Sequence, residues 1–239
     1  MTALGENLER VEDAICAACR AAGRRREDVE LMAVSKTKPP EAMIEAAGLG
    51  LRLFGENRVQ EFLTKAAELG AKRDSMECHL IGHLQSNKAA KAAEIFDGID
   101  SLDSLRLAER LNEAAGKCGK RLPVLIEVKL SPEETKAGID PESEDAARLL
   151  DSLSGFTNLE MRGLMTIAQW GVAEDETRAC FRRLRELRER WAAAHSKLNF
   201  DVLSMGMSGD FRIAIEEGAT RIRVGTGLFG ARARQEDEA

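Results

Sequence analysis

Tyrosine is absent from this 239-residue chain, and aromatic residues make up only 4% of it. A tyrosine hydroxyl therefore cannot act as the proton donor or acceptor in any chemistry that the chain performs. Long hydrophobic runs are also missing. The first 23 residues interrupt their apolar positions with charged side chains. This pattern excludes the apolar core of a signal peptide and a membrane-spanning helix in that segment.

An excess of positive charge is missing as well. The chain has 35 lysines and arginines against 41 acidic residues, which gives a net charge of −6. This balance offers no general attraction for nucleic-acid phosphates or for anionic lipid. We therefore expect no nucleic-acid or membrane partner, and any bound anion must be held by local geometry.

The cysteines form no disulfide framework, because they are five in number and scattered along the chain. They fit a reducing compartment, so we expect a cytoplasmic protein. Cys16 and Cys19 form a CxxC pair, but they lie in a helical pattern and no second pair follows at zinc-finger spacing. His79 and His83 are separated by Gly82 in a stretch that is not helical. We predict packing roles for these residues and no metal site.

Short stretches with strand character alternate with helical stretches eight times along the chain. The expected strands are 31–35, 51–54, 77–81, 96–101, 122–129, 159–167, 200–205 and 221–224. The expected helices are 40–47, 59–69, one from about 86 with Ser86 as its N-cap, 104–115, 142–153, 175–195 and 211–217. Residues 55–57 are expected to form a turn because of Gly55.

Eight strand-then-helix units in about 200 residues predict an α/β fold, a closed (β/α)₈ TIM barrel. A helix over 4–22 precedes a barrel of about 30–230, and no linker divides the chain, so we expect a single domain over 1–239. The competing fold is an open doubly wound sheet. It would carry GxGxxG after the first strand, where this chain has SKTKPP.

The sequence LMAVSKTKPP places Lys36 where the chain leaves the first strand. Burial at that point disfavours the ammonium form, and a neutral amine can attack an aldehyde to form a Schiff base. The alternative is an ordinary surface lysine. Active sites of such barrels form at the carboxyl ends of the strands, so the position favours chemistry.

The loops after the seventh and eighth strands carry small residues and hydroxyls, at 204–210 and 225–227. These are the loops that often bind phosphate in barrels of this kind, because backbone N–H groups can approach a ligand closely there. Each loop alone could simply be a turn or a helix cap. Together with a strand-end lysine they indicate a phosphorylated aldehyde as the ligand.

Five segments together closely resemble the YggS/PROSC family of pyridoxal 5′-phosphate (PLP) homeostasis proteins. They are AVSKTKP, FGENRVQE, HLIGHLQSNK, GLMTIA and LSMGMSGDFRIAIEEGATRIRVGTGLFG. The resemblance runs from about residue 6 to 232 without a large gap. It implies a barrel like the N-terminal domain of alanine racemase, fold type III among PLP proteins, with PLP held as a Schiff base on Lys36.

The resemblance also implies which residues surround the cofactor. Asn57 would lie beside the ring, and Arg223 would face the pyridine nitrogen, where a permanent charge disfavours protonation of that nitrogen. The phosphate would be held by Ser204, Gly206, Ser208, Gly225 and Thr226. The alternative for Arg223 is an ion pair with Glu216 or Glu217 at the barrel rim.

The function implied by the resemblance is to bind and buffer PLP and to pass it to apo-enzymes, without a dedicated catalytic activity. An amino-acid racemase of this fold needs a second base, a tyrosine from a further domain, and we expect neither here. The alternative is a slow racemase or another PLP enzyme that uses Lys36 as its sole base. Lys129 and Lys136 border the loop after the fifth strand and could accept the aldehyde transiently, or could be solvated loop charges.

A third possibility is a partner-binding protein. Phe181, Leu184, Leu187 and Trp191 lie at helical spacing and could form an exposed contact stripe, although packing on the barrel is the favoured interpretation. The family resemblance favours a monomer. The sequence does not indicate which apo-enzymes would receive PLP.

Overall fold

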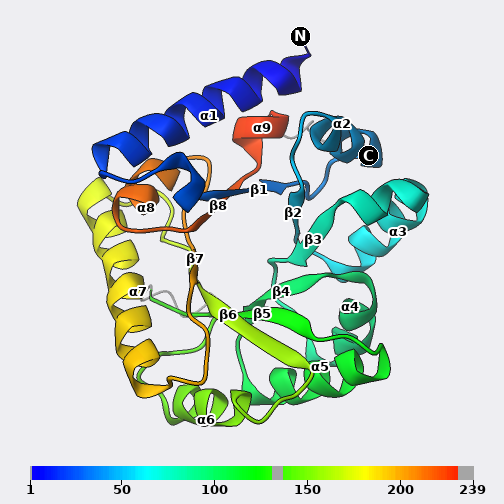
Figure 1. Ribbon diagram of the computed structural model, residues 1–239, viewed down its shortest axis with the longest axis vertical. Helices are drawn as coiled ribbons and strands as arrows, with labels where there is room; N and C mark the ends of the chain where they lie inside the picture. The colour runs from blue at the N-terminus through cyan, green and yellow to red at the C-terminus, as the bar shows by residue number, and fades with distance from the viewer. Residues whose placement is uncertain (1, 131–136, 231–239) are drawn as a thin grey trace, which may run out of the picture.

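The computed structural model describes residues 2–130 and 137–230 and forms a closed parallel barrel (Figure 1). Each strand pairs in parallel with the next along the chain, and β8 pairs with β1 to close the barrel. The strands are β1 (Glu30–Val34), β2 (Leu53–Glu56), β3 (Glu77–Leu80), β4 (Gly98–Leu102), β5 (Leu122–Glu127), β6 (Leu159–Met165), β7 (Val202–Ser204) and β8 (Arg221–Val224). The TIM barrel expected from the sequence is confirmed.

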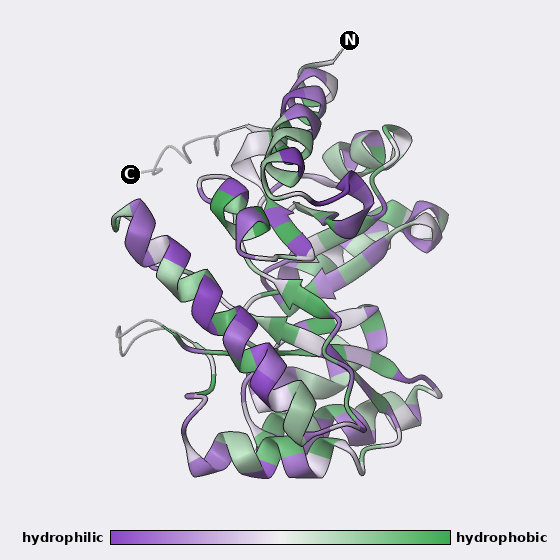
Figure 2. Ribbon diagram, turned by 60° about the vertical axis from the view of Figure 1, so that its left-hand side comes forward, coloured by the Kyte–Doolittle hydropathy of each residue, from purple (hydrophilic) through white to green (hydrophobic). Residues whose placement is uncertain are grey.

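Helices surround the barrel because each crossover between parallel strands must pass over the outside of the sheet. The α-helices are α1 (Ala3–Ala21), α2 (Pro40–Gly48), α3 (Val59–Leu69), α4 (Ala89–Ile95), α5 (Leu105–Lys117), α6 (Glu144–Leu153), α7 (Glu174–Ala194), α8 (Phe211–Glu216) and α9 (Thr226–Phe229). Short 3₁₀ turns occupy Arg26–Asp28, Gly70–Ser75 and Ser86–Lys88. In Figure 2 the strands are coloured mainly as hydrophobic residues. The surrounding helices carry hydrophilic and hydrophobic residues in alternation along their length.

The leading helix α1 lies across the outside of the barrel and packs on α8 and α9 (Figure 1). Leu4, Val11 and Ile15 are buried on its inner face. The Asn7 side chain donates a hydrogen bond to the carbonyl of Leu228 at 2.7 Å, and Arg24 donates to the carbonyl of Ile215 at 2.8 Å. The helix and the segment that follows it are therefore both hydrogen-bonded to the last units of the barrel.

Two local expectations were wrong. Gly55 and Glu56 continue β2 and do not turn, because Gly55 pairs with Val34 on one side and His79 on the other. Pairing with two neighbours outweighs the weak strand propensity of glycine. Ser86 does not cap α4; it begins a 3₁₀ turn, and the α-helix starts three residues later with Lys88 as its N-cap.

The apolar stripe of α7 faces inward. Phe181, Leu184 and Leu187 are at most 3% exposed, and Trp191 is 6% exposed. The stripe packs on the barrel, as the favoured interpretation expected, and is not a surface for a partner.

A cluster of charged side chains fills the amino-terminal end of the barrel. His79 Nδ1 lies 2.7 Å from Asp100 Oδ1, and Arg221 Nη1 lies 3.1 Å from Asp100 Oδ2. Glu77 contacts the other imidazole nitrogen at 2.9 Å, and the side chains of His79, Asp100 and Arg221 are at most 9% exposed. Gly98 makes room, since a Cβ there would lie 2.4 Å from the imidazole ring.

Candidate functional site

Lys36 stands two residues beyond β1, at the carboxyl-terminal end of the barrel, and lines two adjoining cavities. The larger cavity has a volume of about 680 Å³ and extends toward the loops after β6, β7 and β8. The smaller has a volume of about 340 Å³ and extends toward the loops after β3 and β5. Asn57, which directly follows β2, lines both cavities beside Lys36. Both volumes are in the range of small-molecule sites.

Backbone donors converge at one wall of the larger cavity. The N–H groups of Gly225 and Gly227 donate to Ser208 Oγ at 3.3 and 3.2 Å, which joins the loops after β7 and β8. Ser208, Gly225 and Thr226, three of the residues predicted to hold a phosphate, line the cavity. Asp210 lies in the same wall, where its carboxylate accepts the N–H of Met207 at 2.5 Å.

Arg223 projects from β8 into the larger cavity and is 3% exposed. Its guanidinium donates to Ser204 Oγ at 2.8 Å and to the carbonyl of Thr166 at 2.9 Å. Burial lowers the pKa of Arg223, and nearby acidic groups oppose that shift. The alternative ion pair does not form, because Glu216 and Glu217 pair with arginines of α7.

The structure does not bring Ser204 and Gly206 into the cavity wall. Ser204 is fully buried, and its hydroxyl accepts the hydrogen bond from Arg223, so it orients the guanidinium. Gly206 has a φ of +91°, and a Cβ there would lie 2.6 Å from Ala214. Its carbonyl accepts the N–H of Arg223 at 2.9 Å. Both residues contact Arg223, while the phosphate contact expected for them stays a prediction.

A buried ionic network holds the loop that carries the cavity lysine. Lys65 Nζ donates to the carbonyl of Ser35 at 2.8 Å and contacts Glu56 Oε1 at 2.9 Å and Glu61 Oε1 at 2.7 Å. Glu61 also accepts the N–H of Thr37 at 2.5 Å, and Thr37 has a φ of +63°. The backbone is thus fixed on both sides of the lysine, which supports an otherwise unfavourable conformation.

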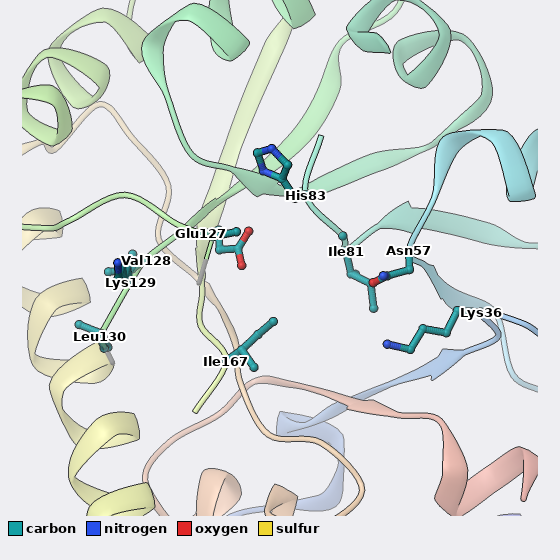
Figure 3. Close-up of a pocket in the computed structure, with 11 residues that line it drawn as sticks. Lys36, Asn57, Ile81, His83, Glu127, Val128, Lys129, Leu130 and Ile167 are labelled. Carbon is teal, nitrogen blue, oxygen red and sulfur yellow. The ribbon is translucent and has the colours of Figure 1, made fainter. Parts of the chain in front are cut away.

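The smaller cavity contains a carboxylate that sequence reasoning missed. Glu127 is the last residue of β5 and is 4% exposed. Figure 3 shows its carboxylate and the Lys36 amine pointing into the cavity from opposite walls. Lys129 and His83 line the same cavity, and His83 lies 3.1 Å from Asp103. Lys136, the second candidate acceptor lysine, lies outside the described residues.

A signal for Glu127 was present in the sequence. It lies two residues before the end of the expected strand 122–129, close to the strand-end position that selected Lys36. In the structure, Glu56 likewise ends β2.

Over residues 2–130 and 137–230, no group of three or more histidine, cysteine or acidic side chains is arranged to hold a metal ion. In the same part of the chain, no helix has the length and apolar character needed to cross a membrane.

Residues 8–233 match the family described as alanine racemase, N-terminal domain. The pyridoxal phosphate homeostasis protein of Pseudomonas aeruginosa is 44% identical over 232 residues, which cover 97% of each chain. The protein of the same name from Escherichia coli K12 is 40% identical over 236 residues, covering 97% of this chain and 98% of that one. This chain belongs to the pyridoxal phosphate homeostasis family.

Solved structures agree with this family assignment. PipY of Synechococcus elongatus with PLP bound is 44% identical and superposes with a TM-score of 0.83, covering 95% of this chain and all of that one. Alanine racemase of Clostridium difficile is 16% identical with a TM-score of 0.71, covering 96% of this chain and 58% of that one. This second likeness shows that the homeostasis family shares its fold with the racemase barrel.

Proposed function

We propose that this chain binds pyridoxal 5′-phosphate in the larger cavity, with the Lys36 amine bonded to the cofactor aldehyde, and serves PLP homeostasis by buffering and delivering it. The observation that carries the proposal is the position of Lys36 at the junction of two cavities, one of which has a wall rich in hydrogen-bond donors. The proteins of this family are named for PLP homeostasis, and the PipY structure contains PLP.

The donors in the larger cavity fit a phosphorylated aldehyde. The hydroxyls of Ser208 and Thr226 suit phosphate oxygens, with Ser208 held in place by the N–H of Gly225, and the nearby guanidinium of Arg223 offsets negative charge. When bound, PLP supplies an aldehyde carbon that an amine attacks and a ring that accepts electron density. Lys36 supplies the amine, while Asn57 borders the ring.

Arg223 faces the pyridine nitrogen in this proposal, with its guanidinium held by Ser204 and Thr166. Because guanidinium stays protonated, it disfavours a proton on the ring nitrogen and weakens the ring as an electron sink. This arrangement suits storage of the cofactor better than amino-acid chemistry. The proposal accordingly assigns the chain no dedicated catalytic activity.

The proposal is tested by adding PLP to the purified protein, reducing with borohydride and mapping the modified peptide. We expect one modification, on Lys36, that is lost in Lys36→Ala. Lys38→Ala is the matched control, because Lys38 lies in the same loop but its amine donates to the carbonyls of Phe229 and Gly230. No modification, or one spread over surface lysines, would overturn the proposal.

We further propose that the chain is a monomeric cytoplasmic carrier that delivers PLP to apo-enzymes. Delivery is tested by mixing the loaded chain with an apo-enzyme in the presence of a trap for free PLP. Reactivation of the apo-enzyme despite the trap supports direct delivery, and complete inhibition by the trap restricts the role to buffering.

A further inference from the structure

The carboxyl group of Glu127 is buried in the Lys36 cavity without a full set of hydrogen bonds. Its Oε2 atom is inaccessible to solvent and has no hydrogen-bond partner among the described residues. A buried polar atom without a partner costs about 1–3 kcal/mol. The side chain points into the cavity from the wall opposite Lys36 (Figure 3). This carboxyl oxygen without a described partner therefore belongs to a side chain that faces the same cavity as the Lys36 amine.

Charged groups face Glu127 from several parts of the barrel. Lys36 comes from the loop after β1 and Lys129 from the segment after β5, and both line the cavity. Asp103, beyond β4, carries the nearby negative charge and is paired with His83 of the loop after β3. Arg223 of β8 is the nearby positive charge on the other side. The segment after β6 contributes the apolar Ile167 to the described lining of this cavity.

These surroundings make the carboxyl group a proton carrier near neutral pH. Burial, with a smaller contribution from the Asp103 charge, raises the pKa of Glu127 to about 7, and Arg223 opposes the shift. A group that is half protonated near pH 7 can both give and take a proton, which is what efficient acid–base catalysis at that pH requires.

We propose that Glu127 is the proton-transfer residue for capture and release of the aldehyde at Lys36. The proposal rests on the proposed function and adds a second residue to the reaction. It is carried by the position of a buried carboxyl group, one oxygen of which has no hydrogen-bond partner among the described residues, in the same cavity as the reacting amine.

Condensation of an amine with an aldehyde forms a carbon–nitrogen bond and releases the aldehyde oxygen as water. The two hydrogens of the neutral amine end on that water. The first passes from nitrogen to oxygen as the bond forms. Glu127 then donates a proton to the departing hydroxyl and recovers the second hydrogen from the nitrogen, so it ends in its starting state. Release is the same sequence in reverse, with water as the co-reactant.

The decisive variant is Glu127→Gln, which keeps the shape of the protonated side chain but cannot transfer a proton. At pH 6, where the native side chain is mostly neutral, we expect the rate constants for PLP capture and release both to fall about 100-fold. The extent of loading at equilibrium should stay unchanged, because a catalyst alters both directions equally. A merely structural role would change the equilibrium instead. Absorbance of the cofactor and fluorescence of Trp170, which lines the larger cavity, report the time course.

Glu160→Gln is the matched control. Glu160 lies near the amino end of β6, where it pairs with Arg162 at 2.9 Å, far from the Lys36 cavity. The native protein and this control should show a capture rate that declines above about pH 7, as the carboxyl group loses its proton. Glu127→Gln should lack that decline. Native capture and release rates in Glu127→Gln from pH 5 to 9 would overturn the inference.

A measurement on the protein without PLP separates this inference from the proposed function. Carbon-13 NMR of the glutamate carboxyl groups, compared between native protein and Glu127→Gln, should identify one resonance that titrates near pH 7. Titration of that resonance below pH 5 contradicts the inference even if Lys36 captures PLP. Absence of any Lys36 modification in the native protein overturns the proposed function, and with it the role assigned to Glu127.

Discussion

The two ends of the barrel both bury charged side chains, but only one end supplies described hydrogen-bond partners for all of their buried polar atoms. At the amino-terminal end, Asp100 accepts hydrogen bonds from both His79 Nδ1 and Arg221 Nη1. At the carboxyl-terminal end, Glu127 Oε2 and Glu56 Oε2 have no partner among the described residues. Strands of the same sheet therefore carry a completed network at one end and an incomplete one at the other.

The difference reflects what each end does. A completed buried network adds rigidity, and removing one member is costly because the others stay buried without it. An incomplete network costs stability and is retained where a ligand completes it or a reaction uses it. We therefore expect the loss of one member of the amino-terminal cluster to destabilise the barrel, whereas in the proposed function the carboxyl-terminal end accepts a cost in stability for the reaction at Lys36.

The largest expected effect comes from breaking the completed network. Asp100→Ala leaves Arg221 and His79 without their shared anion, so we expect the free energy of unfolding to fall by about 3–5 kcal/mol. Urea unfolding at pH 7 measures this loss. Glu113→Ala, which removes an exposed pair with Lys117, should change stability by less than about 0.5 kcal/mol. Equal effects of the two substitutions would show that the buried cluster contributes no more to stability than an exposed ion pair does.

A smaller change in the free energy of unfolding is expected when the pH is raised, because His79 loses its proton. Burial by itself would lower the pKa of His79, but the charge and hydrogen bond of Asp100 and the bond to Glu77 raise it to about 9. The folded chain thus binds this proton more tightly than the unfolded chain, whose histidine has a pKa of 6.5. The stabilisation is complete below pH 6.5 and is lost as the pH rises through 9.

We expect this loss to amount to about 2–3 kcal/mol, and to be absent from His79→Gln. Thermal or urea unfolding of both proteins at pH 6 and pH 9.5 gives the comparison. The same pH dependence in the variant would assign the effect to another group.

The smallest expected change in stability comes from Glu127 at the carboxyl-terminal end of the barrel. The raised pKa of Glu127 means that its contribution to stability is present below pH 4.5 and is lost as the pH rises through about 7. Glu127→Gln removes the buried charge, so at pH 8 we expect the variant to be more stable by about 1–2 kcal/mol, since the amide must still be buried. At pH 5 the two proteins should have nearly equal stability. A variant that is less stable at pH 8 would place Glu127 among the structural residues.

The site was predictable where its residues follow strand ends. Lys36 and Asn57 follow β1 and β2, and Ser208 and Gly225 lie in the loops after β7 and β8, so the order of strands in a parallel barrel brings them to one end. Ser204 stands at the end of β7 by the same rule, yet its hydroxyl is buried against Arg223. The position of a residue relative to the strands predicts at which end of the barrel it lies. It does not predict the direction in which its side chain points.

The sequence by itself determined the barrel, since eight strand-and-helix units and their parallel pairing follow from hydrophobic periodicity and the handedness of crossovers. It also determined the end at which Lys36 lies. Only the tertiary structure decided which buried charged groups find hydrogen-bond partners for all of their polar atoms. Hydrogen bonding and desolvation depend on neighbours that are far apart in the chain. His79 lies beside Asp100 and Arg221, which belong to other strands. Glu127, in contrast, has one carboxyl oxygen without a described partner. That contrast gives otherwise similar buried charges opposite roles at the two ends of the barrel.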